Sequence, residues 1–157
     1  MDSARILSWH TSHSLAYLPA WIIVSLIWRY RIFSETNALL IVAIHLLFGL
    51  SLASHGLFVA APFGKSPQLA AVSATFVAIL SAIFALVFGH ASTGAAVLVS
   101  LILPPAFYVF ATRAVVGYEN HRWATDALKG DPDRGLVLLP LMIVALVRIS
   151  PRVHVSQ

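Results

Sequence analysis

The sequence predicts an all-α fold, a polytopic helical membrane bundle, and three observations lead to that class. No Asp, Glu, Lys or Arg occurs between Lys65 and Arg113, and residues 36–64 also lack formal charge. The chain is 59% hydrophobic and 10% charged, whereas soluble domains carry about 25% charged residues. Its mean hydropathy is +0.87. Because a helix needs about 20 apolar residues to cross roughly 30 Å of hydrocarbon, residues 36–64 suffice for one crossing and 66–112 for two.

The first transmembrane span is expected over residues 15–33, after a short polar segment, residues 1–14, that would lie at the membrane interface. Arg29 and Arg31 end this span, where their long side chains can reach the lipid headgroups. Tryptophan and tyrosine side chains within it suit the interface, where such residues concentrate. Four spans with short connections account for most of the 157 residues, so a single integral-membrane domain is expected.

Three further spans follow, joined by tight connections. The second is expected over residues 37–61, and Pro62 and Pro67 flank the loop that follows it. The third span is expected over residues 68–88 and the fourth over residues 94–117, with a glycine-containing turn between them. Proline and glycine at these connections favour turns over continued helix.

Residues 118–134 are expected to extend the fourth helix into the cytoplasm as far as Lys129. Arg122 and Asp126 have the i,i+4 spacing of an ion pair that supports a helix. Gly130 then suits the C-terminal cap of that helix.

A last helix is expected over residues 135–150. Before it, Asp131 suits an N-terminal cap and Pro132 suits a first helical residue, so the helical segment can begin soon after Gly130. Only the twelve residues 136–147 are apolar or proline without interruption before Arg148. Twelve residues are few for a crossing. This helix is therefore expected to be re-entrant, interfacial or a strongly tilted fifth span.

The distribution of Lys and Arg favours cytoplasmic N- and C-termini. With four spans and a cytoplasmic N-terminus, eight of the ten Lys and Arg residues lie inside, and only Arg29 and Arg31 lie outside. If the last helix also crosses, Arg148 and Arg152 move outside and the division becomes six to four. The positive-inside rule therefore favours four spans.

Small residues form a seam along the third span. Its members recur at or near a seven-residue spacing, which places them within a narrow arc of one helix face. The seam consists of Ala71, Ala74, Ala78, Ala82, Ala85 and Gly89. In the second span Gly49 and Gly56 are also seven positions apart, and small residues let helices approach closely in lipid. We expect these two spans to form a packed antiparallel pair, with self-association between protomers as the alternative use of the seam.

Two histidines, His45 and His55, lie within the second span. Ionisable residues inside a membrane are costly, so each raises a functional hypothesis. An imidazole can ligate haem iron or relay protons, which makes haem b or a proton or ion pathway conceivable. The structural alternative is a neutral histidine hydrogen-bonded to a hydroxyl or carbonyl group of a neighbouring helix.

Pro104 and Pro105 interrupt the fourth span. Each proline lacks a backbone N–H, so the carbonyl groups of Ser100 and Leu101 lose their usual helical partners. Free carbonyl groups at mid-membrane can coordinate a cation, and interrupted helices mark many transport sites. The alternative is a simple kink whose carbonyl groups are satisfied by neighbouring helices.

Residues 119–134 hold most of the polar chemistry of the chain. The residues expected to dock a cytoplasmic partner are Glu119, Arg122, Trp123, Asp126 and Arg134. A hard cation bound by the acidic side chains is the alternative. No calcium-loop spacing or phosphate-binding motif is present to support it.

A small non-catalytic membrane subunit is the leading functional hypothesis, because no catalytic constellation stands out and cysteine chemistry is excluded by the absence of cysteine. Such a subunit would contact lipid and other membrane chains, or itself, and would dock a cytoplasmic partner through residues 119–134. An oligomeric channel or transporter for an ion or small solute is the alternative, and a haem- or quinone-handling anchor is the second. Nucleic acid is not expected as a partner, since the ten basic residues form no stripe.

Overall fold

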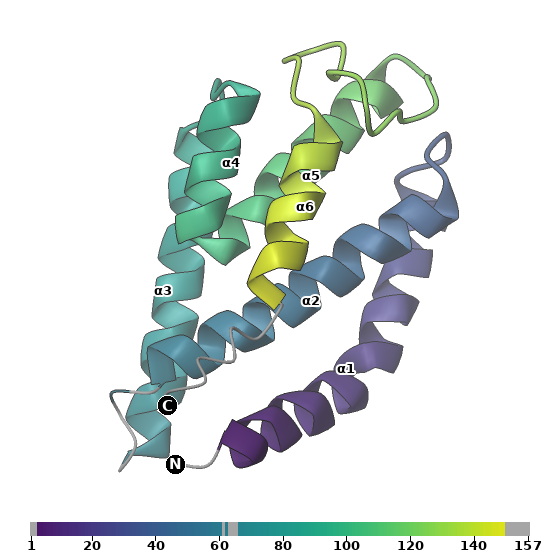
Figure 1. Cartoon of the computed structure of the whole chain (residues 1–157). Helices are drawn as coiled ribbons and strands as arrows, with labels where there is room; N and C mark the ends of the chain where they lie inside the picture. The colour runs from purple at the N-terminus through teal and green to yellow at the C-terminus, as the bar shows by residue number, and fades with distance from the viewer. Residues whose placement is uncertain (1–2, 61, 63–65, 150–157) are drawn as a thin grey trace.

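The computed structural model describes residues 3–60, 62 and 66–149, which form six helices and no strand (Figure 1). The helices are α1 (Ser3–Arg31), α2 (Ala38–Ala60), α3 (Pro67–Val87), α4 (Thr93–Ile102), α5 (Pro104–Asn120) and α6 (Leu138–Ile149). The predicted all-α class is confirmed. Three helices, α1, α2 and α3, are long and apolar enough to cross a membrane.

Helix α1 joins two elements that the sequence suggested were separate. The segment expected at the interface and the first expected span form one helix, and Pro19 lies inside it. The helix bends along its course (Figure 1). A proline inside a helix removes one backbone hydrogen bond and crowds the preceding turn, which is a usual cause of such a bend.

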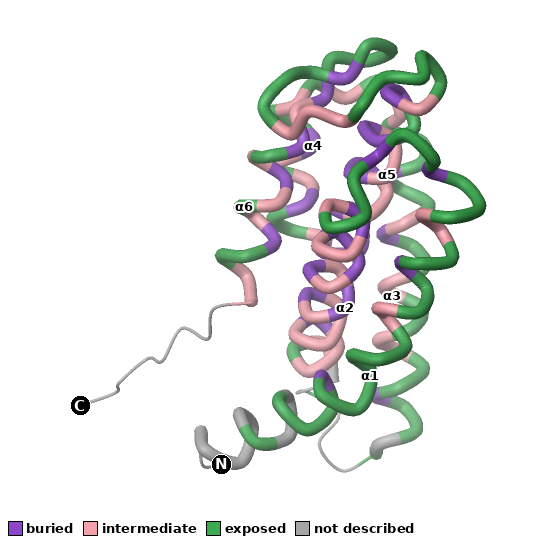
Figure 2. Tube along the Cα trace, turned by 90° about the vertical axis from the view of Figure 1, so that its right-hand side faces the viewer, coloured by how far each residue is buried: buried purple, intermediate pink, exposed green. Residues whose placement is uncertain are grey.

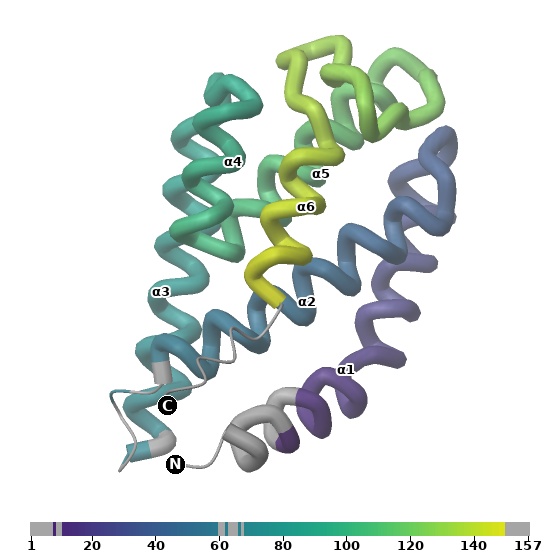
Figure 3. The backbone as a smooth tube through the Cα atoms, viewed as in Figure 1, coloured from purple at the N-terminus to yellow at the C-terminus, as the bar shows by residue number. Residues whose placement is uncertain are grey.

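Helices α4 and α5 form a hairpin, so the fourth expected span, residues 94–117, is not one continuous helix. Leu103 has φ −118° and ψ 91°, which is extended backbone, and Pro104 and Pro105 open α5. The two helices pack against each other and α5 returns toward the end from which α4 started (Figure 3). The physical reason is that two successive prolines remove the donors that would continue α4, while proline is well accommodated in a first helical turn.

Hydrogen bonds show that the hairpin begins and ends at the same end of the bundle. Thr93 at the start of α4 donates to the Gly135 carbonyl group (3.2 Å) and accepts from the Val137 amide (3.1 Å). Arg113, in the second half of α5, donates to the carbonyl groups of Ala85 and Leu86 near the end of α3, at 3.0 and 2.8 Å. We call this end of the bundle the loop end, because the connections formed by residues 32–37, 88–92 and 121–137 meet there.

The predicted division of basic residues between the two membrane sides changes as a result. The predicted count placed Arg29 and Arg31 on one side of the membrane. It placed Arg122, Lys129 and Arg134 on the other side, because it assumed that residues 94–117 cross the membrane. With the hairpin, all five lie at the loop end (Figure 1), while α1 begins at the opposite end.

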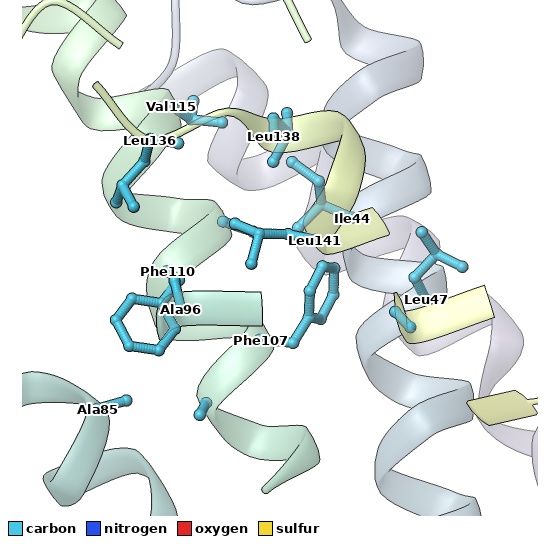
Figure 4. Close-up of a cluster of buried hydrophobic side chains, with 14 of the residues drawn as sticks. Ile44, Leu47, Ala85, Ala96, Phe107, Phe110, Val115, Leu136, Leu138 and Leu141 are labelled. Atoms are coloured by element: carbon cyan, nitrogen blue, oxygen red, sulfur yellow. The ribbon is translucent and has the colours of Figure 1, made fainter. Parts of the chain in front are cut away.

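Helix α2 is the central element of the bundle. It contacts α1, α3, α5 and α6, and its buried positions form a continuous line along one side (Figure 2). The core lies between α2 and the three shorter helices (Figure 4). Its larger members are Ile41, Ile44, Leu47, Phe107, Phe110, Val115, Leu138 and Leu141. The outer faces of α1 and α3 remain exposed and apolar, as lipid-facing surfaces are expected to be.

The small-residue seam of α3 is only partly turned inward. Helices α2 and α3 do pack together and run antiparallel (Figure 1). Ala85 is fully buried, whereas Ala71 is exposed. Gly49 of α2 does not meet the seam, because its missing side chain leaves space for the Trp21 indole of α1, and a Cβ atom built on Gly56 would meet nothing within 4 Å. The prediction that Gly49 and Gly56 form the surface of α2 that packs against the seam was therefore wrong.

The segment after α5 is a loop rather than a helical extension. Helix α5 ends at Asn120, and Arg122 adopts a φ of 55°, so neither the extension to Lys129 nor a cap at Gly130 is found. No helix starts at Asp131-Pro132 either, since α6 begins at Leu138.

Asp131 explains why the chain loops here. Its buried carboxylate accepts hydrogen bonds from the amides of Asp133, Arg134 and Leu136, at 3.0, 2.9 and 2.7 Å. The carboxylate lies directly against Gly117 of α5, where any Cβ atom would collide with it. A carboxylate that satisfies three backbone donors stabilises a turn in place of a helix.

Candidate functional site

A cavity of about 210 Å³ lies beside the break between α4 and α5. It is lined by Ser51, Ser54, His55 and Phe58 of α2, Pro104 of α5 and Arg148 of α6. Four of the six lining side chains come from adjacent turns of α2, because positions i, i+3, i+4 and i+7 share one helix face. The cavity therefore forms where the tip of the hairpin and the end of α6 approach the central helix.

The depth of the cavity follows from the length of α6. Arg148 lies ten residues after Leu138, which corresponds to about 15 Å along the axis at roughly 1.5 Å per residue. Arg148 therefore lies well away from the loop end, in the last turn of α6.

Four buried polar atoms around this cavity make no hydrogen bond within the described residues. Both ring nitrogens of His55, the Ser51 hydroxyl group and Nη1 of Arg148 are buried and make no hydrogen bond there. His55 is 7% exposed and Ser51 is 2% exposed. Buried polar groups are almost always paired, so these groups are available for hydrogen bonds to a molecule in the cavity.

The charge around the cavity is one-sided. Among the lining residues that the structure describes, Arg148 is the only Lys, Arg, Asp or Glu. Among the described residues the ion pairs are His121 with Asp133 and Lys129 with Asp126, both at the loop end. The guanidinium group therefore lacks a carboxylate partner in the part of the chain that the structure describes.

His45, the other histidine of α2, is fully satisfied. Its Nδ1 lies 2.9 Å from the Ile41 carbonyl oxygen and its Nε2 lies 3.1 Å from the Tyr108 hydroxyl group. Because a carbonyl oxygen only accepts, Nδ1 donates, and a neutral ring then accepts the Tyr108 proton at Nε2. The ring also packs against Trp28 and Tyr108 with centroids 5.5 and 5.4 Å away. As placed, His45 has no free nitrogen for iron or for a solute.

Only some of the residues expected at the helix break lie at the cavity. Pro104 lines the cavity, whereas Pro105 is buried in the bundle and Leu101 is exposed. Ser100 is buried one turn before Pro104, and its hydroxyl group also lacks a partner within the described residues, although it is not among the lining side chains. Of the six expected pathway residues, His55 and Pro104 are brought together.

The residues expected to dock a partner lie at the loop end, and three of them are held by internal bonds. Glu119 accepts from the Thr36 amide, Asp126 accepts from the Leu128 amide and Arg134 donates to the Gly89 carbonyl group. Arg122 and Trp123 are exposed. Nearby, hydrogen bonds from Asn120 and His121 hold the pKa of the Asp133 carboxyl group below its ordinary value.

Sequence reasoning missed Arg148 and Ser51. Arg148 was used as the end of an apolar stretch and in the count of basic residues, although a single charge beside such a stretch is itself a signal of a functional site. Ser51, Ser54 and His55 have the spacing of one polar helix face, and that pattern was available in the sequence.

A second hollow, of about 400 Å³, lies on the outer face of α3 and is lined by Ala71, Val72, Thr75, Phe76 and Ile79. Its lining is almost wholly apolar, which suits lipid chains. It brings together no charged side chains. The polar cavity at Arg148 is therefore the candidate functional site.

Comparisons of the chain with family models, with curated proteins and with solved structures found no match.

Proposed function

We propose that the protein is a multi-pass membrane protein that binds a small polar solute in the cavity at His55 and Arg148 and allows it to permeate. The observation that carries this proposal is the set of unpartnered buried polar atoms around a cavity at a helix break. Transporters commonly bind their substrates near mid-membrane, at helices that are interrupted there.

The hairpin supports the proposal because its tip reaches the cavity. Backbone that leaves a helix at membrane depth is tolerated where it is buried in protein or lines a polar cavity. Leu103, Pro104 and Pro105 supply such backbone, and Pro104 contributes to the cavity wall. Solute entering from the loop end would travel beside α2 to this point.

We further propose that the loop end faces the cytoplasm and that the N-terminus lies on the other side. The Lys and Arg residues at or near the loop end are Arg29, Arg31, Arg113, Arg122, Lys129 and Arg134. Arg5 lies in the first turn of α1, at the opposite end. The positive-inside rule favours a cytoplasmic position for the end with the greater number.

The test of the solute pathway is flux into proteoliposomes. Light scattering or radiolabel uptake is measured for a panel of small solutes, both charged and neutral. Ser51→Leu places bulk in the cavity and is expected to reduce uptake at least tenfold. Ser34→Leu makes the same change in the exposed connection between α1 and α2 and is the matched control. Absence of uptake above that of protein-free vesicles for every solute would overturn the proposal.

A second candidate function, a subunit that docks a cytoplasmic partner, is supported by two exposed apolar side chains at the loop end. Trp123 and Leu128 are 57% and 72% exposed, and both lie in the loop between α5 and α6. Large apolar side chains are enriched at protein interfaces. Purification in mild detergent is expected to yield a stoichiometric partner that is lost in the double variant Trp123→Ala, Leu128→Ala. A lone chain in both preparations would count against this function.

A further inference from the structure

We infer that the cavity beside Pro104 binds an oxyanion, a carboxylate or phosphate group, with Arg148 as its charge partner. This inference rests on the proposed function, because it names the class of solute that the same cavity would take.

The first step is that the described residues place no carboxylate near Arg148. The described acidic residues are Glu35, Glu119, Asp126, Asp131 and Asp133. Glu119 lies in the last turn of α5, and the others lie in the connections at the loop end (Figure 1). Four of the five carboxylates accept hydrogen bonds there. Because Nη1 of Arg148 is buried, its positive charge is costly unless an anion lies beside it. The described chain supplies none.

The second step is the kind of hydrogen bond that the cavity offers. Arginine carries only donors, and its planar fork matches a carboxylate or phosphate group. Ser51 offers a hydroxyl donor and a neutral His55 offers one N–H group. The atoms of these side chains that need partners are mostly donors, so the ligand must supply acceptors. A cation would instead meet the guanidinium charge.

The third step is size. The cavity of about 210 Å³ is several times the roughly 30 Å³ that one water molecule occupies in the liquid. Phe58 and Pro104 add apolar surface to the lining. A short-chain monocarboxylate or inorganic phosphate fits such a space. The phosphate group of a lipid carries the same chemistry, so the experiment must separate the two sources.

The probes are acetate, inorganic phosphate and an anionic phospholipid, each added to protein purified in a neutral detergent. Thermal unfolding and equilibrium binding of radiolabelled acetate are measured. Saturable binding of acetate or phosphate, with a rise in melting temperature, is expected for the natural sequence. A rise caused only by anionic phospholipid would assign the oxyanion to a lipid headgroup. In either case the binding and the rise in melting temperature must disappear in Arg148→Gln and Arg148→Met. The binding affinity must fall at least threefold in Arg148→Lys.

Two controls keep the test decisive. Arg148→Met removes an unpaired buried charge, so it is expected to fold at least as well as the natural sequence and lose only the response to anions. Arg31→Gln removes one positive charge from an exposed position at the end of α1 and is expected to leave the response unchanged. An equal response to anions in the natural sequence and Arg148→Met, or no response to any oxyanion, would overturn the inference.

The two proposals can fail separately. If neutral glycerol permeates proteoliposomes at the same rate with and without Arg148, while no oxyanion binds, the solute pathway stands and the inference is wrong. If acetate binds through Arg148 but no solute permeates, the anion site stands and the pathway is wrong.

Discussion

Glu119 and Thr36 are joined by two hydrogen bonds although 83 positions separate them. Oε1 of Glu119 lies 2.7 Å from both the amide nitrogen and the hydroxyl oxygen of Thr36. The same carboxylate accepts from the Glu35 amide, at 3.0 Å. Because a carboxylate only accepts, the Thr36 hydroxyl group donates to it and accepts from Thr125 at 2.8 Å. These bonds tie the connection between α1 and α2 to the end of α5.

Loss of the Glu119 carboxylate is expected to destabilise the bundle. Glu119→Ala leaves the Thr36 amide and hydroxyl group without their acceptor, and hydrogen bonds to charged groups contribute about 1.5–3 kcal/mol. A loss of about 2 kcal/mol in the free energy of unfolding is expected, measured by denaturant unfolding in detergent followed by circular dichroism. Glu35→Ala removes a charge from the same place but leaves its amide intact, so it is the matched control. Equal losses in the two variants would contradict this role for Glu119.

The hairpin predicts which loops share a membrane side. The sequence contains no cysteine, so single cysteines can be introduced without a background. Cysteines replacing Ser34, Ser92 and Arg122 are expected to react with an impermeant maleimide from one side, and one replacing Ser8 from the other. Permeabilised membranes, in which all four must react, provide the control. Labelling of the Ser92 and Arg122 positions from opposite sides would mean that residues 93–120 cross.

Fold class was predictable from the sequence because it depends on composition alone. A long stretch without charge predicts helices that can cross a membrane, and α1, α2 and α3 are long and apolar enough to do so. The position of the helix break was also predictable, since Pro104 and Pro105 lack amide donors. Whether the chain kinks or turns back was not, because that depends on distant contacts such as Arg113 with the Ala85 carbonyl group.

The loop after α5 shows why local patterns failed there. Arg122 and Asp126 have helical spacing, which contributes only a few tenths of a kcal/mol, about 0.2–0.5. Asp131 instead gathers three backbone amides and packs against Gly117. The cavity could not be predicted from local patterns either, because His55 and Arg148 come from helices far apart in the chain.

Two glycines of α2 provide a test of the packing against α1. Gly49→Ala would place a Cβ atom against the Trp21 ring, whereas Gly56 faces open space. Overpacking of this kind costs about 1–3 kcal/mol, so Gly49→Ala is expected to lower the free energy of unfolding by that amount. Gly56→Ala, the control, is expected to be neutral or to stabilise by roughly 0.5–1 kcal/mol, because alanine favours the helix. The measurement is unfolding in detergent, and equal effects at the two positions would rule out the Trp21 contact.

The hydrogen bonds that the Asp133 carboxylate accepts lead us to expect that the stability of the loop end depends on pH. Its carboxylate accepts hydrogen bonds from Nδ2 of Asn120 at 3.0 Å and from Nε2 of His121 at 2.9 Å, and these bonds lower its pKa in the folded protein. A carboxyl group with a lowered folded pKa stabilises the fold at pH values above its ordinary pKa. That contribution is lost as the pH falls through the lowered pKa, because both states then bind the proton.

The measurement compares the natural sequence with Asp133→Asn at several pH values. The difference in melting temperature is expected to be present at pH values above the ordinary pKa of the Asp133 carboxyl group and to shrink as the pH falls through its lowered pKa. Asn120→Ala is expected to move the Asp133 pKa back toward its ordinary value, which carboxyl NMR of the labelled side chain can follow, because the hydrogen bond from Asn120 is the largest cause of the shift. A melting-temperature difference that stays constant across this range would show that the carboxylate contributes nothing through its ionisation.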